Sequence, residues 1–200
     1  SFGFTAWNTW PDEYRLRDEK TLKKFVKEHK EEIECKKFIQ WLFYYQWMNL
    51  KEYAVSKGIE IIGDMPIYVA YDSADVWANP GMFWLDNDLN PVKVAGCPPD
   101  GFSPDGQLWG NPLYRWDLMK EQGYTWWVER IKKSLELFDI VRIDHFRGFA
   151  GYFTIPFGDT TAHNGCWMEG PGYDLFRVVN EELPGAKIIA ENLGFLDESV

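Results

Sequence analysis

Three short apolar runs, separated by long segments with helical periodicity, constrain the fold of this chain more than any other feature of its sequence. The runs cover residues 59–62, 140–143 and 187–190, and all are rich in isoleucine. Short apolar runs of this kind are typical of strands that are buried on both faces of a parallel sheet. Strands that alternate with helical segments predict an α/β fold.

Helices are predicted before each of these runs. The clearest helical face carries Tyr124, Trp127, Val128 and Ile131 at positions i, i+3, i+4 and i+7. The N-terminal stretch 1–17 is rich in aromatic residues and is predicted to be a loop. The predicted helices cover 18–34, which is highly charged and interpreted as a solvated helix, 35–56, which Gly58 ends, 117–136 and 173–182.

Most of the connection between the first two strands, 71–117, is predicted to be a long, irregular loop. Loops of this length are usually functional or disordered, and large aromatic residues argue against disorder. Most of these rings are expected to form a small core of the excursion. Trp109, in "QLWGNP", is the exception, because it stands among polar and turn residues where a ring can stack on a sugar. The seven rings are Trp77, Phe83, Trp84, Phe102, Trp109, Tyr114 and Trp116.

An acidic residue follows each of the three predicted strands. These residues are Asp64, Asp144 and Glu191. In α/β folds the functional groups gather at the carboxyl ends of the strands. A single acid at such a position is as often a structural cap, but three at equivalent positions indicate a pocket lined by carboxylates.

A pair of carboxylates that flanks one bond can cleave a glycosidic linkage. Arg142 lies two residues before Asp144, so both side chains point to the same side of the strand. The guanidinium is expected to lower the pKa of Asp144 and keep it ionised as a nucleophile. Glu191 lies in a less basic setting, "AENLG", which suits a proton donor. His145 is interpreted either as a ligand of a substrate hydroxyl or as a structural histidine.

Acids at three strand ends could instead bind Mg²⁺ beside a lysine or histidine base. The wide separation of the three acids in the sequence, and the lack of a lysine at a strand end, argue against this alternative. We therefore expect neither a metal nor another cofactor.

Composition argues against two classes of partner. The net charge of −10 argues against nucleic acid and against an anionic membrane as a binding surface.

The three cysteines show no disulfide framework, and neither a signal peptide nor an apolar run of transmembrane length is visible. We therefore expect a cytoplasmic location. The sequence predicts no oligomeric state.

Four long motifs carry a resemblance to a known family. They are "GDMPIYVAYDSADVW", "WGNPLYRWD", "VRIDHFRGF" and "IIAENLG". Together they resemble 4-α-glucanotransferases of the amylomaltase type, also known as disproportionating enzymes. The resemblance implies an α-amylase-like (β/α)8 barrel with insertions. It also implies the transfer of an α-1,4-glucan segment to the 4-hydroxyl of another glucan, without a metal.

The resemblance also implies roles for individual residues. Asp144 is expected to be the nucleophile and Glu191 the general acid/base. Arg142 and His145 are expected beside the nucleophile, in contact with substrate. Asp64 is implied as a sugar-binding carboxylate, and the resemblance places Trp109 on the acceptor side.

The family carries a third catalytic carboxylate on a later strand, beyond the last residue of this sequence. A full barrel also needs about 250 residues. We therefore expect residues 1–200 to be an incomplete fragment of a single catalytic barrel, inactive alone, with 71–117 as a loop excursion within it. Two alternatives remain open, a hydrolase of the α-amylase type and a non-catalytic module that binds α-glucans.

Overall fold

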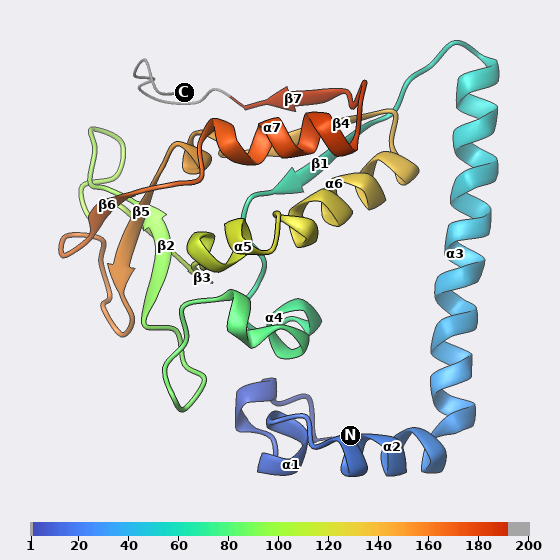
Figure 1. Ribbon diagram of the computed structural model, residues 1–200, viewed down its shortest axis with the longest axis horizontal. Coiled ribbons are helices and arrows are strands. Elements are labelled where there is room, and N and C mark those ends of the chain that lie inside the picture. The colour runs from blue at the N-terminus through green and yellow to red at the C-terminus, as the bar shows by residue number, and fades with distance from the viewer. Residues whose placement is uncertain (1, 192–200) are drawn as a thin grey trace. The chain divides into compact units, whose positions relative to one another are not determined.

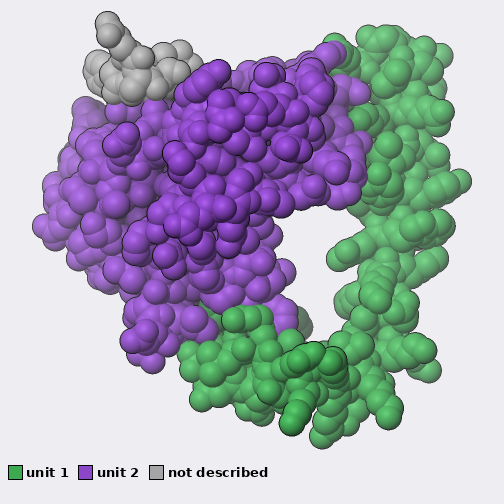
Figure 2. All heavy atoms as spheres, in the orientation of Figure 1, with its two compact units in different colours: residues 1–61 green, residues 62–200 purple. Residues whose placement is uncertain are grey.

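The structure is a computed structural model that describes residues 2–191 of the chain. It divides into two compact units, residues 1–61 and 62–200 (Figure 2), which are described separately here. The candidate site residues all belong to the second unit. In the described residues, no helix has both the length and the apolar character that a membrane crossing requires.

The first unit consists of helices. Two short turns, η1 (Trp7–Thr9) and α1 (Asp12–Arg15), occupy the stretch that was predicted to be a loop. The predicted helices 18–34 and 35–56 meet earlier than expected. The first, α2, covers Glu19–Glu28, and the second, α3, covers Lys30–Ser56. The boundary falls at His29, whose backbone leaves the helical conformation.

Gly58 ends α3, as predicted. Its φ is +73°, and its N–H donates to the carbonyl of Val55 at 2.9 Å. This left-handed conformation suits glycine and is a common way to end a helix. The next residue, Ile59, still donates its N–H to Ala54, so the first apolar residues of the run belong to the helix terminus.

The second unit contains the predicted parallel sheet. Its strands are β1 (Ile62–Pro66), β4 (Ile140–Asp144) and β7 (Ile188–Ala190), in the order β1-β4-β7 with both pairs parallel. The predicted strands near 140 and 187 are confirmed, whereas the strand predicted at 59–62 begins only at Ile62.

Only one face of this sheet is buried in the described structure. The helix α6 (Thr125–Leu137) contacts β1 and β4, and α7 (Tyr173–Glu182) packs against α6 (Figure 1). On β4, the side chains of Val141 and Ile143 are fully buried, while Arg142 and Asp144 alternate with them. The expectation of burial on both faces is therefore wrong, because the other face carries the charged residues of the candidate site.

The helix predicted at 117–136 is two helices, α5 (Trp116–Glu121) and α6. Gly123 and Tyr124 separate them, with φ values of +64° and +53°. The predicted apolar face is nevertheless confirmed, and its four residues are all buried: Tyr124, Trp127, Val128 and Ile131.

The stretch 71–117 is not an irregular loop. It contains α4 (Ala74–Ala78), η2 (Pro80–Met82), β2 (Lys93–Cys97) and β3 (Gln107–Pro112). The two strands form an antiparallel sheet with β5 (Gly151–Pro156) and β6 (Cys166–Glu169), in the order β3-β2-β5-β6. The short 3-10 turn η3 (Phe146–Phe149) links β4 to β5. The local sequence did not indicate this sheet, because half of its strands follow β4 in the chain.

The predicted aromatic core of this region is confirmed for three of the seven rings. Phe83, Tyr114 and Trp116 are buried. Tyr114 packs against both of the others, with ring centroids 5.3 and 5.0 Å away. Phe102 is the clearest departure, because its side chain is fully exposed.

Candidate active site

The strands of the parallel sheet bring the three predicted acids together. Asp144 is the last residue of β4, and Glu191 follows β7 directly. Ile143 pairs with Ala190, so Asp144 and Glu191 stand at the same level of adjacent strands. Asp64 lies inside β1 rather than after it, two residues below the level of Asp144.

Arg142 joins all three acids. Its Nη1 donates to Asp64 Oδ1, and its Nη2 donates to Glu191 Oε1 and, at 3.1 Å, to Asp144 Oδ1. Because one nitrogen contacts both Asp144 and Glu191, their carboxyl groups lie within two hydrogen-bond lengths of each other. Retaining glycosidases place their carboxyl pair about 5 Å apart. One guanidinium among three carboxylates leaves the cluster with an excess of negative charge.

The pKa shifts of the two central acids are opposite in direction to the predicted ones. Partial burial and the neighbouring Glu191 raise the pKa of Asp144, although Arg142 acts to lower it. The pKa of Glu191 is lowered, first by the backbone N–H of His145 and then by Asp144 and Arg142. The physical reason is the number of donors, because Glu191 accepts from a backbone N–H as well as from the guanidinium.

The backbone of His145 contacts Glu191, and its ring contacts Trp109. Its N–H donates to Glu191 Oε2 at 2.8 Å, and its φ of +53° is uncommon for a non-glycine residue. The imidazole packs edge-on against Trp109, with ring centroids 4.8 Å apart. Burial, followed by the charge of Arg147, lowers the pKa of His145. A neutral imidazole at pH 7 can donate to one hydroxyl and accept from another.

Trp109 lies in β3 and connects the antiparallel sheet to the acids. Its indole Nε1 donates to Gln107 Oε1 at 2.9 Å, and its ring contacts both His145 and Tyr68. The structure therefore brings all six predicted site residues into one continuous set of contacts.

Comparison with known proteins identifies the family of this chain. A family model described as 4-alpha-glucanotransferase matches residues 1–200. This chain belongs to the 4-alpha-glucanotransferase family. It is 51% identical over 198 residues to the 4-alpha-glucanotransferase of Clostridium butyricum, covering 98% of this chain and 41% of the relative. It is 50% identical over 200 residues to that of Streptococcus pneumoniae, covering 100% of this chain and 40% of the relative.

A solved structure confirms the fold class. The amylomaltase of Streptococcus agalactiae in complex with acarbose superposes with a TM-score of 0.95 and 47% identity, covering 98% of this chain and 40% of that one. The predicted α/β fold, part of an α-amylase-like (β/α)8 barrel with insertions, is thereby confirmed. The chain spans about two fifths of the length of these relatives.

Tyr68 is a neighbour of the site that the sequence analysis did not single out. Its side chain is 6% exposed, and its ring lies between those of Trp109 and Tyr114, with centroids 6.2 and 5.9 Å away. The sequence signal that could have identified Tyr68 is its position two residues after the end of β1, where functional groups gather in α/β folds.

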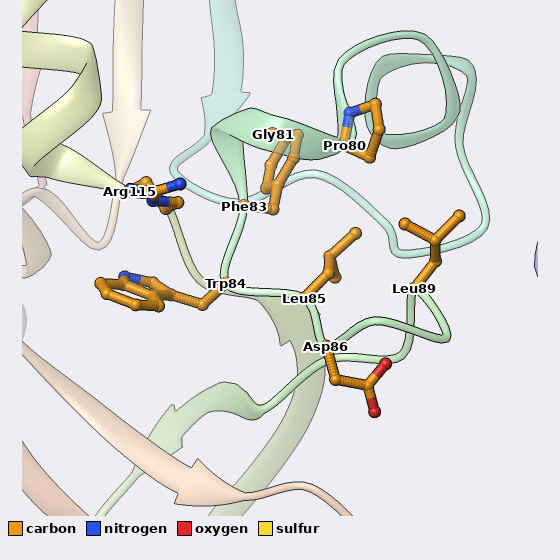
Figure 3. A pocket seen from close by; sticks show the side chains of 8 residues that line it. All are labelled: Pro80, Gly81, Phe83, Trp84, Leu85, Asp86, Leu89 and Arg115. Atoms are coloured by element: carbon orange, nitrogen blue, oxygen red, sulfur yellow. The ribbon is translucent and has the colours of Figure 1, made fainter. Parts of the chain in front are cut away.

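Two cavities lie apart from these residues. The larger, about 380 Å³, is lined by residues from 80 to 89 and by Arg115 (Figure 3). The smaller, about 230 Å³, shares Trp84 with it. Neither contains any of the six predicted site residues. Within residues 2–191, no three His, Cys, Asp or Glu side chains are grouped so that they could hold a metal ion.

Proposed function

We propose that the full-length protein containing this chain is a 4-α-glucanotransferase that acts by a retaining double displacement. The observation that carries the proposal is the carboxyl pair Asp144 and Glu191 at equivalent ends of adjacent parallel strands, joined by Arg142. Family membership supports the same assignment. The substrates are α-1,4-glucans, namely maltooligosaccharides and amylose.

In the first half-reaction, an Asp144 oxygen forms a bond to the anomeric carbon of a bound glucan. The bond from that carbon to the glycosidic oxygen breaks, and Glu191 gives its proton to the departing 4-oxygen. In the second half-reaction, Glu191 takes the proton from the 4-hydroxyl of an acceptor glucan. The acceptor oxygen then bonds to the anomeric carbon, and the Asp144 carboxylate leaves.

The lowered pKa of Glu191 in the free site fits the second half-reaction, in which Glu191 starts as a carboxylate and accepts a proton. The first half-reaction needs Glu191 in its protonated form. A sugar ring that binds over the two carboxyl groups excludes water, and desolvation favours the neutral form of a carboxyl group. The remaining assignments rest on the resemblance of the sequence motifs to the family, with Asp64 and His145 as hydrogen-bond partners of sugar hydroxyls and Trp109 as a stacking ring on the acceptor side.

The test is product analysis after the full-length protein has been incubated with maltotriose. We expect glucose together with a ladder of longer maltodextrins, and no products with Asp144→Asn. Glu191→Gln is expected to reduce turnover by about 10²–10⁴-fold, the usual contribution of a general acid/base. Glucose and maltose without longer products would assign the α-amylase-type hydrolase, and binding without turnover would assign the glucan-binding module.

We also propose that the protein is cytoplasmic. Its three cysteines, Cys35, Cys97 and Cys166, are all free thiols, which suits a reducing compartment. The relative from Solanum tuberosum, 46% identical over 195 residues, is named as chloroplastic/amyloplastic. Fractionation of the source cells with an antibody to this chain would decide between cytosol and an organelle or exterior.

A further inference from the structure

The chain that leaves β1 is held by side chains from other elements. Arg130, in α6, donates from Nη2 to the carbonyl of Pro66 at 2.7 Å and from Nη1 to that of Ile67 at 3.1 Å. The same guanidinium lies 5.3 and 4.9 Å from the rings of Trp126 and Trp127. Carbonyl groups in the interior need a partner, and a charged fork that meets two of them fixes the direction of the chain.

Two residues of the excursion complete this anchoring. The hydroxyl of Tyr114 donates to the carbonyl of Ile67 at 2.8 Å, and Asn111 donates from Nδ2 to that of Val69 at 2.9 Å. Tyr114 is fully buried, and its hydroxyl also accepts from Arg130 Nη1 at 3.3 Å. The segment 66–69 is therefore tied both to the helix behind the parallel sheet and to the region around β3.

Tyr68 stands in the middle of this anchored segment and carries its position to the site. Its ring is nearly parallel to that of Tyr114, with an interplanar angle of 17°. On its other side it meets Trp109, which in turn packs edge-on against His145. Trp109 thus packs against a ring that directly follows the two carbonyl groups bound by Arg130.

We propose that Arg130 and Tyr68 are positioning residues for the acceptor side of the site. Arg130 fixes the carbonyls of the two residues that precede Tyr68, and Tyr68 sets the orientation of Trp109 and, through it, of the His145 ring. The expected effect of these residues on acceptor binding rests on the proposed function. A misplaced Trp109 weakens the stacking of the incoming glucan and leaves Asp144 and Glu191, on other strands, in place.

The test separates the two half-reactions in the full-length protein. Bond cleavage is followed as the burst of 4-nitrophenol from a 4-nitrophenyl α-maltooligoside, and transfer is followed as the acceptor KM for glucose. Arg130→Lys keeps the charge but loses the fork. We expect it to raise the acceptor KM about tenfold and to leave the burst rate within about twofold of the wild type.

Three further variants complete the design. Tyr68→Leu removes the ring and should behave like Arg130→Lys, whereas Tyr68→Phe keeps the ring and should restore the wild-type acceptor KM. Arg177→Lys is the matched control, because Arg177 forms surface ion pairs with Asp174 and Glu181. Crystal structures of the wild type and of Arg130→Lys provide a readout that does not depend on activity.

An unchanged acceptor KM in Arg130→Lys, or an equal loss of burst and transfer, overturns the positioning role. If the wild type itself transfers no sugar, the proposed function fails, and the crystal structures then decide the inference. A Trp109 ring displaced from its contact with His145, 4.8 Å between centroids in the wild-type geometry, supports the positioning role. An undisturbed ring overturns it.

Discussion

Arg142 controls the electrostatics of the candidate site because it contacts three carboxylates at once. The hydrogen bond to Asp64 is the largest cause of the raised pKa of Arg142, and partial desolvation acts in the opposite direction. The guanidinium acts in the opposite sense on the acids, and its charge lowers the pKa of both Asp144 and Glu191. Without it, two adjacent carboxylates would repel each other with no counter-charge between them.

The substitution Arg142→Gln is therefore expected to move the acidic limb of the kcat/KM profile to higher pH. Loss of the guanidinium raises the pKa of both carboxyl groups, so the required carboxylate is protonated over a wider acidic range. Activity at neutral pH should also fall, by about 10²-fold or more. The measurement is kcat/KM from pH 4 to pH 8 on the full-length protein, with Arg177→Gln as the control. An acidic limb of the kcat/KM profile that stays in place or moves to lower pH would contradict this account.

For individual residues, the sequence predicted that the candidate site residues lie together but did not predict their contacts. The identities and strand positions of Asp144, Glu191 and Arg142 could be predicted, because a parallel strand directs its carboxyl end to the site. The hydrogen bond from the backbone N–H of His145 to Glu191 could not, since it depends on a left-handed φ at His145. That contact is the largest cause that lowers the pKa of Glu191, which was expected to be raised.

The secondary-structure elements differ in how well the sequence predicted them. The helix α7 has the predicted bounds, 173–182, because its periodicity is local and its apolar residues Leu175 and Val179 face the interior. The strands β2 and β3 lie in the predicted loop, and the central one, β2, pairs with β5, which follows β4 in the chain. Pairing with a distant strand leaves no signal in a short window of sequence.

The close approach of β2 and β3 gives a test at the level of these elements. A Cβ on Gly96 would lie 2.1 Å from the backbone oxygen of Gln107 and 2.4 Å from Ile155 Cδ1. Gly96→Ala must therefore push the two strands apart, and we expect it to lower the free energy of unfolding by about 1–3 kcal/mol. Chemical denaturation of the full-length protein would measure the loss.

Gly81→Ala is the control for this substitution. A Cβ at Gly81 meets no atom within 4 Å, so its stability should stay within about 0.5 kcal/mol of the wild type. Equal stability of Gly96→Ala and Gly81→Ala would show that the strands are not in close contact at Gly96.

For the whole molecule, the most informative feature is the apolar surface of α3. Large side chains lie exposed along this helix, and several stack on one another, including Phe38 on Trp41 and Trp41 on Tyr45. Helices that are apolar on several sides are normally buried. The relatives are more than twice as long as this chain, and the single-barrel organisation proposed for the full-length protein would supply the covering surface.

We therefore expect residues 1–200, expressed alone, to bind the dye ANS strongly and to self-associate. The full-length protein should do neither under the same conditions, because large exposed apolar patches mark surfaces that are covered in the complete assembly. Dye fluorescence and light scattering on the two proteins make the comparison. If residues 1–200 alone stay monomeric and bind no ANS, the apolar surface of α3 does not need to be covered by the rest of the protein.

The order of the strands has a consequence for inheritance. The chain alternates between its two sheets, since β2 and β3 precede β4 while β5 and β6 follow it. Any exchange of genetic material with a single crossover inside 93–169 would therefore divide the antiparallel sheet, which carries Trp109, between two parents. The strand bearing Asp144 lies between the two halves of that sheet. A crossover between residues 109 and 144 would also separate the ring that the proposed acceptor meets from the acid that the donor meets, so only recombinants that keep this sheet intact inherit both from one parent.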